Sequence, residues 1–221
     1  MLIKMAAPLI AREWSVYPRD PYLLIRFPKA LEVAKAIGRE IGRHHAHHTI
    51  MNLRYQDPEC ALTLREGIAE YRSYLRHIGR KAMVDSEGSR LILEHDATHV
   101  IFGMDTSLEQ EAGLDTWLLF GCEFKWRYVR GYAQLPEIKA LYQALLTECG
   151  WRLFPRLYWK CLGLKWRIVR RTRRMQQKWL FRFPEAWLDQ PITALRAQHG
   201  IDILLPEERD TGHLIHWSGV Y

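Results

Sequence analysis

Apolar residues recur at helical spacing along most of this chain of 221 residues, and segments with the alternating pattern of strands are scarce. A clear example runs from about Leu62 to Ile78, where apolar side chains repeat every three or four residues and Gly79 follows as a stop signal. A chain that offers one apolar face after another at this period buries them by packing helix on helix. We therefore expect an all-α fold.

Start and stop residues predict the bounds of further helices. Thr106 with Glu109 three residues later has the form of a capping box, so a helix is expected to begin there and to run towards Gly131. The other expected helices cover about 29–45, the stretch opened by Ser86–Ser89 and closed by Gly103, 136–149, 155–180 and 184–198.

Composition and the lack of a linker sequence favour a single all-helical domain over residues 1–221. The chain is 48% hydrophobic and 26% charged, which excludes disorder, and no Pro/Gly/Ser-rich linker divides it. No stretch of 18 residues is free of charge, so no membrane-spanning helix is expected, and the N-terminus has no signal-peptide pattern. The four cysteines are widely spaced: Cys60, Cys122, Cys149 and Cys161. We expect a cytoplasmic protein, soluble or peripherally attached to a membrane.

The positive charge is concentrated in one segment, Lys165–Arg182. It carries eight basic and no acidic residues, with aromatic residues between them, whereas the net charge of the whole chain is +7. Such a run favours contact with anionic lipid headgroups, with a solvated helix face as the plainer alternative. Nucleic acid is not expected as a partner, because no nucleic-acid motif accompanies the charge.

A metal-ligand pattern lies in the expected helix that ends at Gly103. His95 and His99 are four residues apart, so on a helix, at about 100° per residue, both imidazoles project from one face. Asp96 lies at the edge of the same arc. Eleven residues separate His99 from Glu111, which places both within about two turns of the connecting turn. If the two helices form an antiparallel pair, Glu111 completes a site with the histidines.

This donor set suits a divalent metal. Two imidazoles with one or two carboxylates favour zinc first, with iron(II), manganese or magnesium as alternatives, and leave positions open for substrate or water. The predicted ligands are His95, Asp96, His99 and Glu111, and Asp96 is also the candidate catalytic carboxylate or a partner that orients a histidine.

The same residues resemble the coenzyme Q biosynthesis protein 4 family. His95, Asp96, His99 and Glu111 match its pattern of HDxxH, eleven residues and Glu. The stretch LREGIAEYRSYLRHIG is similar to a Leu-Gly-x-x-Tyr segment of that family, and FPEAWLDQPITALRAQHGI to its closing Trp…Pro…Leu-Arg…Gly-Ile segment. The resemblance covers about residues 62–201 and points to a bacterial-type member.

The resemblance implies a function in ubiquinone biosynthesis. It implies an all-helical homodimer, peripheral on the inner face of the membrane, that acts on a polyprenylated hydroxybenzoate. The implied reaction is a metal-dependent oxidative decarboxylation that replaces the carboxylate at ring carbon 1 by hydroxyl, which makes the protein a decarboxylase (lyase) and hydroxylase. It also implies partners: an isoprenoid lipid or quinone precursor and other enzymes of quinone biosynthesis.

Two alternatives stay open. The first is a non-catalytic scaffold that binds isoprenoid or quinone lipids, in which a metal only holds the helix pair together. The second is an HD-type phosphohydrolase, in which His95-Asp96 acts with the upstream cluster His44, His45, His47 and His48; the plainer reading of that cluster is a helix C-terminus. The aromatic stripe after Glu111 favours a core face over an isoprenoid tunnel. Its members are Trp117, Leu118, Phe120 and Phe124.

Overall fold

The computed structural model describes residues 53–80, 83, 85, 89–123, 125 and 134–209, with residue 137 described by its backbone alone. These residues all belong to one compact unit that begins at Leu53. The expected helix at 29–45 and the histidine cluster at 44–48 lie outside the described residues. A single domain over the whole chain therefore stays a prediction.

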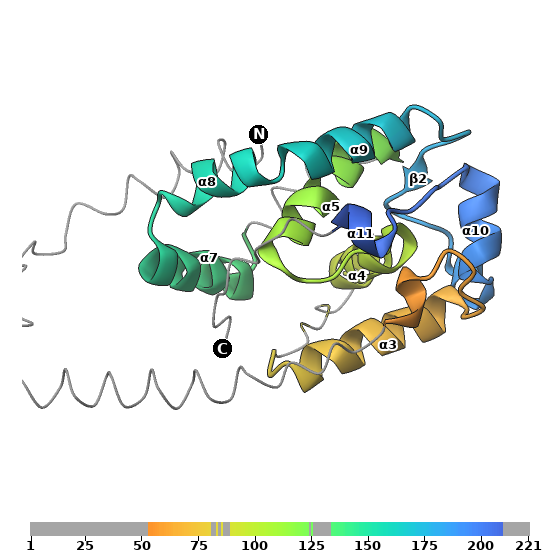
Figure 1. The fold of residues 1–221 in the computed structure, drawn as a ribbon. Coiled ribbons are helices and arrows are strands. Elements are labelled where there is room, and N and C mark those ends of the chain that lie inside the picture. Colours follow the sequence, from red (N-terminus) through yellow and green to blue (C-terminus); the bar gives the residue numbers. More distant parts are fainter. Residues whose placement is uncertain are drawn as a thin grey trace, which may run out of the picture. The chain divides into compact units, whose positions relative to one another are not determined.

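The described part of the chain is mostly helical, which confirms the all-α prediction (Figure 1). Its α-helices are α3 (Leu64–His77), α4 (Leu91–Phe102), α5 (Leu108–Gly121), α7 (Pro136–Cys149), α8 (Leu153–Lys160), α9 (Leu162–Thr172), α10 (Ile192–His199) and α11 (Pro206–Arg209). Two 3₁₀ turns, η3 (Arg54–Gln56) and η4 (Glu185–Asp189), lie between them. The short strands β1 (Cys122–Glu123) and β2 (Trp179–Leu180) pair in parallel.

Several helix ends lie where the local sequence predicts them. Thr63 and Glu66 form a capping box at the start of α3. Gly103 ends α4 in the left-handed conformation, with φ of 65°. α7 begins with a proline in its first turn and ends before Gly150. These signals are local, so the tertiary structure does not alter them.

Other helix ends differ from the prediction. The expected Thr106–Glu109 capping box is wrong, because Ser107 is the N-cap of α5 and accepts a hydrogen bond from the backbone N–H of Gln110. Glu109 is instead buried against α8, where it pairs with Lys160 at 2.8 Å. A carboxylate that is buried needs a compensating charge, and Lys160 supplies it. Capping the start of α5 would not supply such a charge to Glu109.

Three of the longer predicted helices are shorter than expected. α5 stops at Gly121, where β1 begins, instead of continuing towards Gly131. The stretch 155–180 forms α8 and α9, which end at Thr172, before β2. The stretch 184–198 begins with the 3₁₀ turn η4 and becomes α-helical only at Ile192. β1 and β2 pair with each other at positions where helix was expected to continue, and Pro191 is the N-cap of α10.

α4 and α5 form the centre of the described unit. α3 packs on one side of α4, and α9 packs on α5 at the other side (Figure 1). Phe102 of α4 stacks on Trp117 of α5, with ring centroids 4.6 Å apart, and both are fully buried. Trp117 therefore belongs to the core, as the aromatic stripe predicted. Phe120 is 50% exposed, so the prediction is wrong for that residue, and Phe124 lies outside the described residues. None of the described helices has the length and apolar character needed to cross a bilayer.

Candidate metal centre

α4 is buried around most of its circumference, so its polar side chains must find partners inside the protein. His95 and His99 lie one turn apart on this helix. Their ring centroids are 4.8 Å apart, and the planes are steeply inclined at 72°. The i, i+4 spacing thus brings the two imidazoles together, as the helical geometry predicts.

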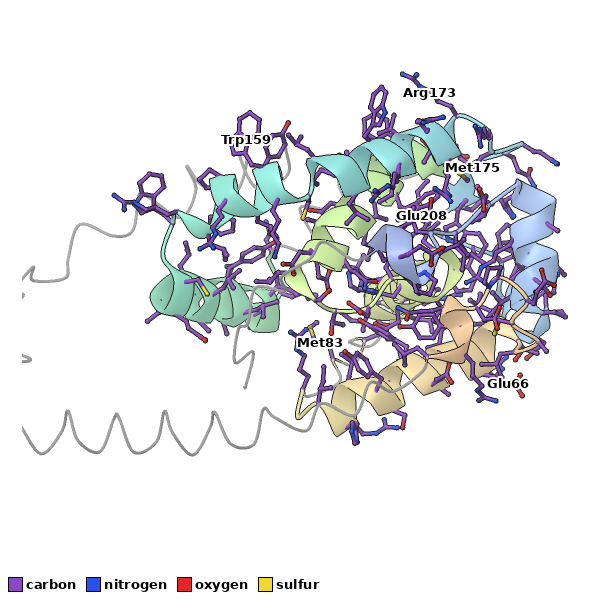
Figure 2. The ribbon with its side chains drawn as sticks, in the orientation of Figure 1. Glu66, Met83, Trp159, Arg173, Met175 and Glu208 are labelled. Carbon is purple, nitrogen blue, oxygen red and sulfur yellow. The ribbon has the colours of Figure 1, made fainter. Side chains whose placement is uncertain are left out.

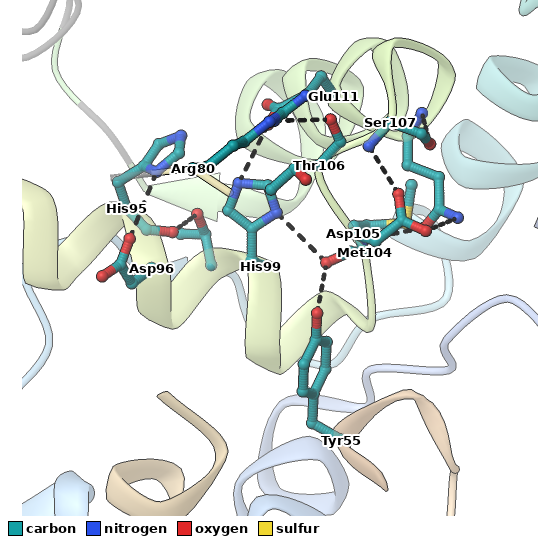
Figure 3. A network of polar contacts seen from close by, with 12 residues as sticks. Tyr55, Arg80, His95, Asp96, His99, Met104, Asp105, Thr106, Ser107 and Glu111 are labelled. Carbon is teal, nitrogen blue, oxygen red and sulfur yellow. Dashed lines mark hydrogen bonds and ion pairs between the residues drawn. The ribbon is translucent and has the colours of Figure 1, made fainter. Parts of the chain in front are cut away.

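His99 is held in one orientation by its surroundings. Its ring stacks on Tyr71 of α3 at 4.7 Å, and the side chain is completely buried. Nδ1 lies 3.2 Å from the carbonyl oxygen of Met104, to which the Tyr55 hydroxyl also donates (Figure 3). Because a carbonyl only accepts, Nδ1 must carry the proton. Burial, followed by the charge of His95, holds the pKa of His99 well below its usual range, so the ring is neutral and Nε2 presents a lone pair.

Glu111 of α5 faces that lone pair. Its Oε1 lies 3.5 Å from Nε2 of His99, and this nitrogen is buried without a hydrogen-bond partner. A lone pair and a carboxylate oxygen at this distance repel each other unless a proton or a cation lies between them. Burial raises the pKa of Glu111 to about 7, although about a third of the side chain, 37%, is exposed.

The three side chains form a group that can hold a metal ion. His95, His99 and Glu111 each offer one ligand atom, and these atoms lie within 4.8 Å of one another. Tetrahedral ligands at about 2.1 Å from a zinc ion are about 3.4 Å apart, so binding requires the most distant ligand atoms to approach each other by up to about 1.4 Å. The donor set fits a divalent transition metal: two imidazole nitrogens, one of them the unpartnered buried Nε2 of His99, and one carboxylate.

Asp96 lies beside this group and not within it. Its Oδ2 accepts a hydrogen bond at 2.6 Å from Nε of Arg72 on α3, and its Oδ1 is 3.9 Å from Nδ1 of His95. Burial opposes protonation of His95, but its neighbours Asp96 and Glu111 outweigh that effect and raise the pKa of the imidazole. This geometry suits a carboxylate that orients a ligand histidine, one of the two roles expected of Asp96.

Arg80 brings a positive charge to the same place. It follows the C-terminus of α3, and its Nη1 donates to the carbonyl oxygen of Thr106 at 3.1 Å (Figure 3). After burial and the charge of His95, the charge of Arg80 is the next influence on Glu111, and it lowers the pKa of that carboxyl. The sequence pattern did not identify Arg80 or Arg72, because Arg72 lies in α3 and Arg80 follows it, both outside the motif along the chain.

The basic run is only partly exposed. Lys165 turns inward and donates to the carbonyl oxygen of Ala112 at 2.6 Å. Arg171 pairs with Asp202 and Glu208. The other six basic residues of the run are exposed: Arg167, Arg170, Arg173, Arg174, Lys178 and Arg182. Lys165 and Arg171 therefore do not belong to an exposed basic surface, and the other six basic residues of Lys165–Arg182 do.

Comparison of the chain with protein-family models, with curated proteins and with solved structures finds no match. Function is therefore inferred from the residues of the site and from the resemblance of the motif.

Proposed function

We propose that this protein is a metal-dependent enzyme of ubiquinone-type quinone biosynthesis, which converts the ring carboxylate of a polyprenylated hydroxybenzoate to a hydroxyl group. The observation that carries the proposal is the buried, unpartnered Nε2 of His99 opposite Glu111, with His95 one turn away. Three donors of these types around an unsatisfied position are what a catalytic divalent metal requires. The resemblance of the motif to the coenzyme Q biosynthesis protein 4 family supplies the substrate class.

In this proposal α4 and α5 act as an antiparallel pair that holds the metal through His95, His99 and Glu111. When bound, a divalent metal would act as a Lewis acid on the phenol or carboxylate oxygen of the substrate. Replacing the carboxylate by hydroxyl releases carbon dioxide, adds one oxygen atom and removes two electrons from the ring. The reaction therefore also needs a two-electron oxidant, such as dioxygen.

The residues of the chain supply orientation and charge. Arg80 is placed to bind the substrate carboxylate, because a guanidinium beside a cluster of donors matches a carboxylate in charge and shape. Tyr71 and the Met104 carbonyl fix the tautomer and the plane of His99. Asp96, held by Arg72, lies 3.9 Å from Nδ1 of His95 and orients that imidazole.

A single-turnover assay tests the reaction. Metal-loaded protein is mixed with a prenylated hydroxybenzoate labelled at the carboxyl carbon, and labelled carbon dioxide and hydroxylated ring are measured under several oxidants. We expect product from the wild type and from Glu59→Gln, an exposed control with the same chemical change as Glu111→Gln. Product should be absent with Glu111→Gln and His99→Ala, and Arg80→Met should raise KM more than it lowers kcat.

A lipid-binding scaffold is the second candidate, favoured by the exposed aromatic side chains of α8 and α9. The absence of labelled product with every metal and oxidant, together with retained binding of the prenylated compound, would support the scaffold. Release of phosphate from a nucleotide or prenyl phosphate would instead support the phosphohydrolase. The same protein preparation serves all three assays, so the outcomes are directly comparable.

A further inference from the structure

Large aromatic side chains are exposed along the outer side of α8 and α9 and at the turn before α8. Trp151, Trp159 and Trp166 are 69%, 70% and 59% exposed. Five of the seven exposed large apolar side chains of the described residues lie between 151 and 166. Single exposed apolar residues are ordinary on a protein surface, but a row of tryptophans along one helical stretch is not.

The row has helical periodicity. Trp151, Trp159, Leu162 and Trp166 repeat at multiples of three to four residues, so they share one side of the α8–α9 stretch. The opposite side is buried and carries the side chains that pack inward: Leu153, Leu157, Cys161, Leu164 and Ile168. The inner side packs against α5, so the tryptophans are not needed to build the core.

Exposed arginines accompany the tryptophans, and no acidic residue occurs between positions 151 and 182. The basic residues that turn inward have partners, as in the pair of Lys160 with Glu109. Arg152, Arg156, Arg170 and Arg173 are exposed, whereas Arg182 at the end of the range pairs with Glu94 at 3.8 Å. We name the exposed set the tryptophan face: Trp151, Arg152, Arg156, Trp159, Leu162, Trp166, Arg170 and Arg173. Figure 2 shows Trp159 and Arg173 projecting from the same side of α8 and α9.

We infer that the tryptophan face is the surface by which this protein docks on an anionic lipid bilayer. Tryptophan rings sit at the headgroup level of bilayers, and arginines flanking them are attracted to anionic lipids. The inference rests on the membrane location in the proposed function, but it requires neither metal nor catalysis. It also replaces the whole Lys165–Arg182 run as the contact surface, because part of that run faces inward.

A second copy of the chain is a poorer occupant. Two tryptophan faces packed on each other would bring several arginines of each copy together without a carboxylate to neutralise them. A bilayer with anionic headgroups satisfies both features at once, because the rings enter the interfacial layer while the arginines remain at the phosphates.

Vesicle binding of the full chain tests this inference. Co-sedimentation measures partitioning onto phosphatidylcholine vesicles and onto mixed phosphatidylcholine–phosphatidylglycerol vesicles. We expect the wild type to prefer the mixed vesicles and Arg173→Glu to bind them at least fivefold more weakly, since each basic group near such a surface contributes about 1 kcal/mol. Trp159→Ala should weaken partitioning onto them by about fivefold or more.

Matched variants separate the face from general charge and hydrophobicity. Arg76→Glu makes the same charge change at an exposed position on α3, on the other side of the described unit (Figure 1), and should bind like the wild type. Leu205→Ala removes an exposed apolar side chain elsewhere, with the same expectation.

Four results would overturn the inference. They are equal wild-type binding to both kinds of vesicle, wild-type binding by Arg173→Glu or Trp159→Ala, equal losses with Arg76→Glu, and a dimer that Trp159→Ala converts to monomer without any lipid binding. Failure of the decarboxylation assay leaves vesicle binding unaffected, so the two proposals are tested separately.

Discussion

His99 has the most restricted polar side chain at the candidate site, and its restriction determines what the site can bind. Its Nδ1–H donates to Met104, and its ring lies against Tyr71, so neither the tautomer nor the plane can change without breaking a contact. The remaining nitrogen faces Glu111 at 3.5 Å. A neutral imidazole fixed in this way can bind a cation through Nε2, whose lone pair lies in the plane of the ring.

Metal affinity should rise steeply as the pH increases through about 7. Glu111, with a pKa raised by burial to about 7, must lose its proton before it can act as a ligand. Calorimetric titration with zinc or manganese at about pH 6 and about pH 8 measures the change, and we expect at least about tenfold tighter binding at the higher value. An affinity independent of pH in this range would contradict a role for Glu111.

Without metal, the contribution of Glu111 to the free energy of unfolding changes with pH in the opposite direction: it decreases as the pH rises. Its pKa is higher in the folded protein than in the unfolded chain, so the folded state retains the proton more tightly. The contribution of Glu111 is therefore fully present below about pH 4.5 and is lost as the pH rises to about 7. Glu111→Gln should remove this part of the pH dependence of unfolding in metal-free protein.

At the scale of elements, α4 is the helix on which the others converge, and a buried arginine closes its C-terminal end. Arg196 of α10 donates to the carbonyl oxygens of Val100 and Ile101 in the last turn of α4, and to those of Tyr55 and Asp57 before α3. A cation at a helix C-terminus complements the macrodipole and satisfies carbonyls that have no partner within the helix.

Replacing Arg196 should therefore be costly. Arg196→Met leaves several buried carbonyls without donors, and we expect the free energy of unfolding to fall by about 3 kcal/mol or more in urea denaturation. Arg196→Lys should recover only part of this loss, because an ammonium lacks the planar set of donors. Arg65→Met, which breaks an exposed pair with Asp189, should cost less than about 1 kcal/mol. Equal losses at the two positions would refute the capping role.

The contact between α3 and α4 depends on a glycine. A Cβ at Gly67 would lie 2.6 Å from Cγ1 of Val100 and 2.8 Å from Cδ1 of Ile192. Val100 is β-branched and fully buried, so it cannot turn away easily. Gly67→Ala should destabilise the protein by about 1–3 kcal/mol in spite of alanine's better helix propensity.

A second glycine provides the control. Gly163 lies in α9 with open space around the position of a Cβ, so Gly163→Ala should stabilise the protein by up to about 1 kcal/mol. Thermal denaturation of the two variants compares them directly. Opposite signs are expected, and destabilisation by both substitutions would show that steric contact at Gly67 is not the cause.

At the scale of the whole molecule, metal binding should stabilise the fold, because the ligands come from two helices that unfolding separates. A ligand at 100 times its Kd contributes about 2.7 kcal/mol, which corresponds to a rise in Tm of about 5–10 °C for a chain of this size. Scanning calorimetry with zinc, manganese and iron(II) measures the rise. Glu59→Gln should keep it and Glu111→Gln should lose it, and an unchanged Tm for the wild type would argue against a metal centre.

The sequence alone determined those properties that depend on residues close together along the chain. The all-α class follows from the apolar period, the end of α4 from Gly103, and the convergence of His95 and His99 from a spacing of four. Each of these properties is local, since hydrogen bonding and side-chain direction within a helix repeat every few residues. The spacing of eleven residues allows Glu111 to lie beside His99 only if the second helix folds back on the first, and the structure places the two side chains 3.5 Å apart.

Only the tertiary structure decided which distant groups pair. Asp96 meets Arg72, Glu109 leaves the expected cap to meet Lys160, and Arg196 reaches α4 across 95 residues of sequence. Packing also divided the basic run into inward and outward residues. The physical reason is that a buried charged group is stable only beside a compensating partner. Folding decides which group lies beside it, and the distance along the chain does not specify that partner.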